Sequence, residues 1–88
     1  MLELTDARLW ELQKSEDYKD RFRAEYWQVK LRYDTLHKML VNYDAGALSF
    51  EPTNIDVLRQ QAAAMGKYLY VLEVRSVLEK IDLQEMLE

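Results

Sequence analysis

The sequence contains no cysteine, a single histidine (His37), one proline and two glycines among its 88 residues. Without cysteine the chain has no disulfide framework and no thiolate metal site, and one histidine cannot form a two-histidine metal site. It also has no apolar run of about 18 residues and no signal-peptide pattern. We therefore expect a soluble, cytoplasmic protein without a membrane segment and without a bound metal.

Motifs of established enzyme chemistry are missing as well. The chain has no glycine-rich phosphate loop, no serine or cysteine nucleophile motif, and no carboxylate pair combined with a histidine in a motif. We expect a protein that is not an enzyme and needs no cofactor. The net charge is −4, from 12 Lys and Arg against 16 Asp and Glu, and this balance argues against binding to double-stranded nucleic acid.

A long stretch free of helix breakers dominates the first half of the chain. Residues 16–44 contain no glycine or proline; Ser15 and the acids after it offer a helix start, and Gly46 offers a stop. Within this stretch seven apolar positions alternate in spacings of four and three residues: Phe22, Tyr26, Val29, Tyr33, Leu36, Leu40 and Tyr43. Such a heptad seam requires a facing helix of similar length.

The facing helix is predicted over residues 53–82. Thr53 and Asp56 read as a capping box at its start. A second seam follows at the same alternating spacing: Ile55, Leu58, Ala62, Met65, Leu69 and Leu72. A further apolar row extends the pattern: Val71, Val74, Leu78 and Ile81. The connecting loop 45–52 is short, so the two helices are expected to be antiparallel neighbours.

The sequence therefore predicts an all-α fold in one domain spanning residues 1–88. A short N-terminal helix over residues 6–14 precedes the long antiparallel helical hairpin, and residues 83–88 form a tail. Phe50 and Leu48 are expected to cover the open end of the hairpin. A chain of this length buries only about 60–65% of its unfolded surface, so we also expect a homo-oligomer.

Two large apolar side chains of the first long helix, Trp27 and Leu31, lie off its seam. An exposed tryptophan is unfavourable unless something covers it. Either the N-terminal helix, which carries Trp10, folds over them, or another subunit does. Both alternatives remain open, and Trp10, Trp27 and Leu31 are the candidate interface residues.

Basic side chains flank the seam of the first long helix. Arg23, Lys30 and His37 are seven residues apart, which places them along one edge of that helix. They are either edge charges that orient the two helices or an anion-binding strip beside aromatic rings.

Tyrosine is frequent, with six in the chain. Tyr26 and Tyr33 lie on the first seam, and Tyr68 lies off the second. A row of tyrosines is typical either of the edge of a core or of a site that stacks flat bases. Gly66 follows three alanines inside the second long helix, where glycine costs about 1 kcal/mol relative to alanine. It either makes room for tyrosine rings of the facing helix or lets a ligand approach the backbone.

Residues 22–40 and 58–75 together resemble a widespread group of small phage and prophage proteins, otherwise uncharacterised helical hairpins. Within the second stretch, five residues at helical spacing are similar to the hairpin of phage anti-CBASS sponge proteins: Gln61, Met65, Tyr68, Leu72 and Arg75. Those sponges are oligomers that sequester cyclic oligonucleotide alarm signals without cleaving them.

The resemblance implies a phage-encoded anti-defence protein that binds a nucleotide-type immune signal, such as a cyclic oligonucleotide, in the host bacterial cytoplasm. The phosphates would be held by Arg23, Lys30, Arg32 and Arg75, and the bases would stack on Tyr26, Tyr33 and Tyr68. One alternative is an anti-CRISPR-like inhibitor that contacts a host defence protein through Trp10, Trp27, Leu31 and the acidic C-terminal end. The other is a purely structural or assembly hairpin.

Overall fold

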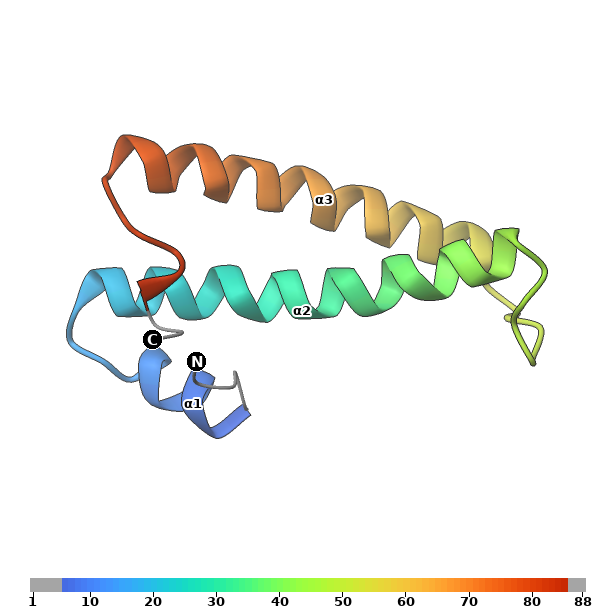
Figure 1. Cartoon of the computed structure of the whole chain (residues 1–88), viewed down its shortest axis with the longest axis horizontal. Coiled ribbons are helices and arrows are strands. Elements are labelled where there is room, and N and C mark those ends of the chain that lie inside the picture. The colour runs from blue at the N-terminus through green and yellow to red at the C-terminus, as the bar shows by residue number, and fades with distance from the viewer. Residues whose placement is uncertain (1–5, 86–88) are drawn as a thin grey trace.

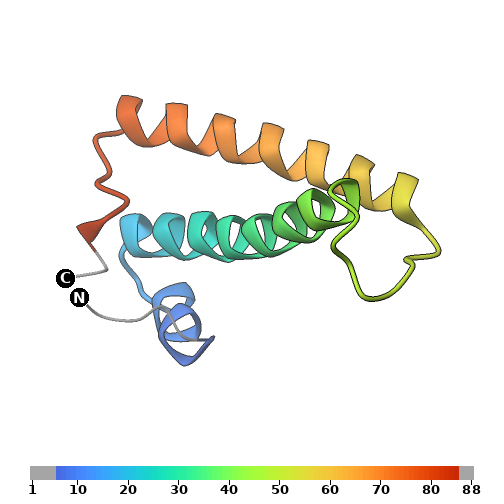
Figure 2. The same cartoon turned by 45° about the vertical axis from the view of Figure 1, so that its right-hand side comes forward.

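The computed structural model describes residues 6–85 of the chain. This part of the chain contains three helices and no strand. Helix α1 spans Asp6–Gln13, α2 spans Tyr18–Asp44 and α3 spans Ile55–Leu78. Helices α2 and α3 form a long antiparallel hairpin, and α1 packs on the side of α2 that faces away from α3 (Figures 1 and 2). The expected all-α fold with a long hairpin is confirmed. No helix within residues 6–85 combines the length and apolarity required to cross a bilayer.

The ends of α2 follow local chemistry. Asp17 is the N-cap, and its carboxylate accepts a hydrogen bond from the backbone N–H of Lys19 at 2.9 Å. The Ser15 hydroxyl accepts from the Asp17 N–H at 3.1 Å and donates to Asp20, so it supports the cap without being the cap itself. At the other end Gly46 has φ +72°, the left-handed conformation expected just after a helix.

The start of α3 differs from the predicted capping box. Asn54 takes the N-cap position, without a side-chain hydrogen bond to the helix, and the first turn closes through Leu58 N–H to the Asn54 carbonyl at 3.0 Å. A capping box needs its acid three residues after the cap. With Asn54 as the cap, Asp56 is one position too early, so the interpretation of Thr53 and Asp56 is wrong.

The main core lies between α2 and α3 at the end where the N-terminus of α2 meets the C-terminus of α3. It contains five buried residues: Phe22, Tyr26, Leu69, Leu72 and Ile81. Gly66 shows why the hairpin can close tightly, because a Cβ there would lie 3.3 Å from Cε1 of Tyr33. The interpretation that Gly66 makes room for a tyrosine ring is confirmed.

Beyond α3 the chain turns back instead of continuing as a helix to residue 82. Lys80 adopts φ +57°, and the Ile81 N–H bonds the Ser76 carbonyl at 2.8 Å. This turn drives Ile81 into the core at 5% exposure. The segment then crosses the N-terminal part of α2 (Figure 1). We name residues 79–85 the return segment; the last residues of the predicted tail, 86–88, lie outside the described part of the chain.

The open end of the hairpin is not covered as expected. Phe50 is 59% exposed, and Leu48 is half-buried. The second apolar row of α3 is also largely uncovered, since Val71, Val74 and Leu78 are all exposed. The periodicity placed these residues on a common face, but the return segment draws only Ile81 from that row into the core.

Candidate functional site

The N-terminal helix covers Trp27. Leu9 and Leu12 are buried against Ala24 of α2, and Trp27 packs half-buried between this cluster and the main core. The indole N–H of Trp27 donates to the Leu83 carbonyl at 2.7 Å. Of the two alternatives for Trp27, docking of the N-terminal helix is therefore the one observed. Trp10 and Leu31, the other two candidate interface residues, are 58% and 39% exposed.

Arg23, the first residue of the expected anion-binding strip, is buried with its guanidinium engaged inside the chain. Its Nε donates to the Asp82 carbonyl at 2.7 Å, and its terminal nitrogens pair with Asp20 and Glu85. A guanidinium with these acceptors has few donors left for a phosphate. Arg23 instead anchors the return segment on α2.

The other two residues of the strip also have partners within α2. Lys30 forms an ion pair with Asp34 at 3.0 Å. The His37 ring stacks on Tyr33 with 5.6 Å between ring centroids. The Lys30 ammonium also lies 6.0 Å from the centroid of the same Tyr33 ring. The seven-residue spacing therefore reflects a shared edge of the helix, on which Lys30 and His37 both contact Tyr33 while Arg23 binds the return segment.

Arg75 closes the other edge of the hairpin. It forms an ion pair with Glu79 at 3.0 Å, donates to the Tyr18 hydroxyl, and lies 4.9 Å from the centroid of the Phe22 ring. The Tyr18 hydroxyl in turn donates to Glu79 at 2.7 Å. This hydrogen bond, followed by the one from Arg75, lowers the pKa of the Glu79 carboxyl below its ordinary value.

The three candidate stacking tyrosines have different environments. Tyr26 is buried and its hydroxyl donates to Glu73 at 2.7 Å; burial, and then this bond, raise its pKa. Tyr33 packs over Gly66. Tyr68 is 40% exposed, so its ring is the one of the three most open to a ligand or a partner.

Arg32 differs from the five other arginines of the chain. Each of those has an acceptor: Arg8 has Glu11, Arg21 has the Ser15 carbonyl, Arg23 has Asp82, Arg59 has Asp44 and Arg75 has Glu79. Arg32 is exposed, and its guanidinium has no hydrogen-bond or ion-pair partner among residues 6–85. A guanidinium left without an acceptor is available for an anion from outside the chain.

The register of the hairpin places Arg32 on the same side as Tyr68. Tyr18 of α2 contacts Arg75 of α3 on that side. Because the helices are antiparallel, two heptads forward from Tyr18 reach Arg32, and two heptads back from Arg75 reach Gln61. Tyr68 stands one heptad before Arg75. Arg32, Tyr68 and Arg75 of the predicted site therefore lie along one side of the hairpin, but two heptads, about 21 Å of helix, separate Arg32 from the Tyr18–Arg75 contact, so they do not form one cluster. Lys30 lies on a different side of α2.

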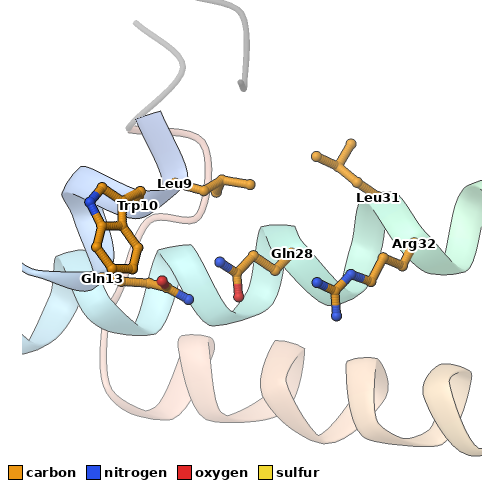
Figure 3. Close-up of a pocket in the computed structure, with 6 residues that line it drawn as sticks. All are labelled: Leu9, Trp10, Gln13, Gln28, Leu31 and Arg32. Atoms are coloured by element: carbon orange, nitrogen blue, oxygen red, sulfur yellow. The ribbon is translucent and has the colours of Figure 1, made fainter. Parts of the chain in front are cut away.

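A cavity of about 180 Å³ opens between α1 and α2, and Arg32 forms one end of it. Its lining consists of Leu9, Trp10, Gln13, Gln28, Leu31 and Arg32. In Figure 3 the guanidinium of Arg32 and the amide of Gln28 both extend toward α1. The lining contains one charge, which is positive, and no carboxylate. The cavity therefore combines an indole, two amides and a free guanidinium.

The structure has two further hollows, of which one borders the cavity. A shallow apolar groove of about 450 Å³ shares Leu31 and Arg32 with the cavity and is completed by Thr35, Leu36 and Met39. A polar hollow of about 470 Å³ lies around the Arg23 cluster, where four carboxylates outnumber two arginines. That charge balance repels anions. Arg32, which lines both the cavity and the groove, is thus the best-placed cation for an anionic ligand.

The sequence pattern did not single out Gln13 and Gln28. Gln28 lies four residues before Arg32, so helical spacing could have grouped those two. Gln13 could not be found in this way, because it reaches the cavity from α1, and how α1 docks depends on tertiary contacts.

The comparisons with known proteins found a family that matches most of this chain. A family model described as Sequestin matches residues 16–78. No curated protein and no solved structure matches the chain. The matched residues include both helices of the hairpin and the loop between them, which is more than half of the chain. The chain therefore belongs to the Sequestin family.

Proposed function

We propose that this protein binds a nucleotide-type immune signal and sequesters it without cleaving it, as a phage-encoded anti-defence protein acting in the host bacterial cytoplasm. The family name is consistent with sequestration of a molecule. The observation that carries the choice of ligand class is the guanidinium of Arg32, which has no partner among residues 6–85, in a chain of net charge −4. Guanidinium groups suit phosphates because they can form two parallel hydrogen bonds to them.

The surroundings of Arg32 supply the remaining chemistry of a nucleotide site. The indole of Trp10 offers a flat surface for stacking, worth about 1–3 kcal/mol per base in single-strand binding proteins. The amides of Gln13 and Gln28 make no hydrogen bond with other residues of the described chain, and amides can pair with base edges. The cavity of about 180 Å³ is smaller than the roughly 300–1,000 Å³ of pockets that enclose a drug-sized ligand, so we expect it to take one base.

Sequestration acts by stoichiometry. A protein that removes a signal in this way needs tight binding and slow release, and it needs no group that attacks the ligand. We therefore propose that the protein is not an enzyme. Arg32 holds a phosphate, the α1–α2 cavity holds a base, and neither role involves proton transfer or a nucleophile.

The test is a thermal-shift assay against a panel of cyclic dinucleotides and trinucleotides, with the corresponding linear mononucleotides for comparison. The proposal predicts that at least one cyclic nucleotide raises the melting temperature in proportion to its concentration, by mass action. A melting temperature unchanged by every member of the panel at millimolar concentration would reject the proposed ligand class. Co-purification with one host protein, without any nucleotide effect, would favour the alternative of a protein inhibitor.

A further inference from the structure

Besides the seam that faces α2, helix α3 carries another heptad seam on its exposed side. Seven positions again alternate in spacings of four and three residues: Val57, Gln61, Ala64, Tyr68, Val71, Arg75 and Leu78. They are distinct from the seam that faces α2. Four of them are large, apolar or aromatic, and exposed: Val57 at 58%, Tyr68 at 40%, Val71 at 46% and Leu78 at 75%. An apolar stripe at this period is typical of a helix that packs on another helix.

The apolar positions of this seam are arranged almost symmetrically about Tyr68. Val57 and Leu78 lie at almost equal distances on either side of Tyr68, and so do Ala64 and Val71. Two copies of α3 packed antiparallel would therefore place Val57 opposite Leu78 and small Ala64 opposite larger Val71. The two Tyr68 rings would meet at the centre. This self-complementarity is what a two-fold symmetric interface requires, because the same surface meets itself.

Charge also fits a second copy. The seam contains one charged residue, Arg75, and Glu79 neutralises it within the same chain. Pairing therefore brings no uncompensated charge to the seam.

We infer that the exposed seam of α3 is a homodimer interface in which two copies pair antiparallel about Tyr68. The partner is a second copy of this chain. The pairing does not rest on the proposed function.

The absence of cysteine permits a direct test, because each introduced thiol is unique. Tyr68→Cys is treated with a short bis-maleimide in the absence of nucleotide. Antiparallel pairing predicts rapid formation of cross-linked dimer. The matched control is Val77→Cys, which is 77% exposed but outside the seam and is expected to cross-link at least tenfold more slowly. Equal rates for the two variants would overturn the assignment of the seam.

The orientation is tested with Val57→Cys and Leu78→Cys. Antiparallel pairing predicts cross-linking when the two variants are mixed and little when either is alone; efficient cross-linking of each alone would indicate parallel pairing and overturn the proposal. Sedimentation equilibrium of the unmodified protein should give twice the 10.5 kDa chain mass. A monomer at all concentrations would also overturn the proposal, and a different protein would then have to cover the seam. Because no nucleotide is present, failure here is separate from failure of the proposed function.

Discussion

The indole N–H of Trp27 donates to the backbone carbonyl of Leu83 at 2.7 Å, and this bond ties the return segment to the N-terminal part of α2. Arg23, one helical turn earlier, holds the neighbouring Asp82 carbonyl at the same distance, 2.7 Å. Two side chains of α2 thus satisfy successive carbonyls of a segment that lies outside the three α-helices. The same indole packs against the cluster formed by α1 and against the main core, so Trp27 connects α1, the hairpin and the return segment.

Replacement of Trp27 by phenylalanine should lower the free energy of unfolding by about 1–3 kcal/mol. The substitution keeps an aromatic ring but leaves the Leu83 carbonyl without its donor, and an unsatisfied polar group costs this much when it is sheltered from water. Urea denaturation followed by circular dichroism measures the change. Trp10→Phe is the matched control, because Trp10 is 58% exposed and its replacement should change stability by less than about 0.5 kcal/mol. Equal effects of the two substitutions would contradict the role given to Trp27.

The effect of Gly66→Ala should depend on Tyr33. In the natural background, the gain in helix propensity of about 1 kcal/mol is offset, because the new Cβ would lie 3.3 Å from Cε1 of the Tyr33 ring. In a Tyr33→Leu background the ring is gone, and Gly66→Ala should stabilise the protein by close to the full 1 kcal/mol or so. A double-mutant cycle measured by chemical denaturation gives the coupling. Equal effects in both backgrounds would show that the ring does not require the glycine.

The sequence predicted the fold more completely than the site. The two inner seams were readable because burial along a helix follows a fixed period, and Phe22, Leu69 and Leu72 are all buried as expected. The reversal at Lys80 was not readable, because it depends on contacts made by Asp82 and Leu83 main-chain carbonyls. Backbone acceptors leave no mark on a side-chain pattern.

The same limit applies to the basic residues of the expected anion-binding strip. Heptad spacing put Arg23 and Lys30 on a common edge, but spacing cannot tell which cation meets a carbonyl or carboxylate from a distant segment. Arg32 was among the candidate phosphate ligands, but only the structure shows that it lacks an acceptor within residues 6–85 while the five other arginines each have one. Gln28 lines the cavity only because α1 docks beside it.

Stability should fall in acid partly through Glu79. Its pKa in the folded protein is lowered from 4.5 by hydrogen bonds from Tyr18 and Arg75. The stabilisation is therefore fully present above pH 4.5, the value expected for the unfolded chain, and is lost as the pH falls through the lower folded pKa. Glu79→Gln should consequently be less stable than the natural protein at pH 6 and should lose less stability between pH 5 and pH 3. Glu25→Gln, at an exposed position, should keep the natural pH profile; identical profiles for Glu79→Gln and the natural protein would exclude this role.

Loss of Arg32 should weaken nucleotide binding, whereas loss of Lys30 should not. Removing a charged hydrogen-bond donor from a phosphate costs about 1.5–3 kcal/mol, which corresponds to a fall in affinity of roughly 10- to 150-fold for Arg32→Ala. Lys30→Ala removes the same charge from another side of α2, where the lysine is paired with Asp34, so affinity should change less than about twofold. Isothermal titration with whichever nucleotide gives a thermal shift measures both. The reverse order of effects would move the phosphate site away from the cavity.

The central claim is that a nucleotide is held and not consumed. The most direct measurement incubates the protein with an equimolar cyclic nucleotide that raises its melting temperature, removes the free ligand by gel filtration, and denatures the complex by heat. Chromatography of the released material should then recover the starting nucleotide unchanged, in near-stoichiometric amount, even after prolonged incubation. Recovery of linearised or hydrolysed products in amounts that grow with time would contradict sequestration, as would the absence of any nucleotide in the protein fraction.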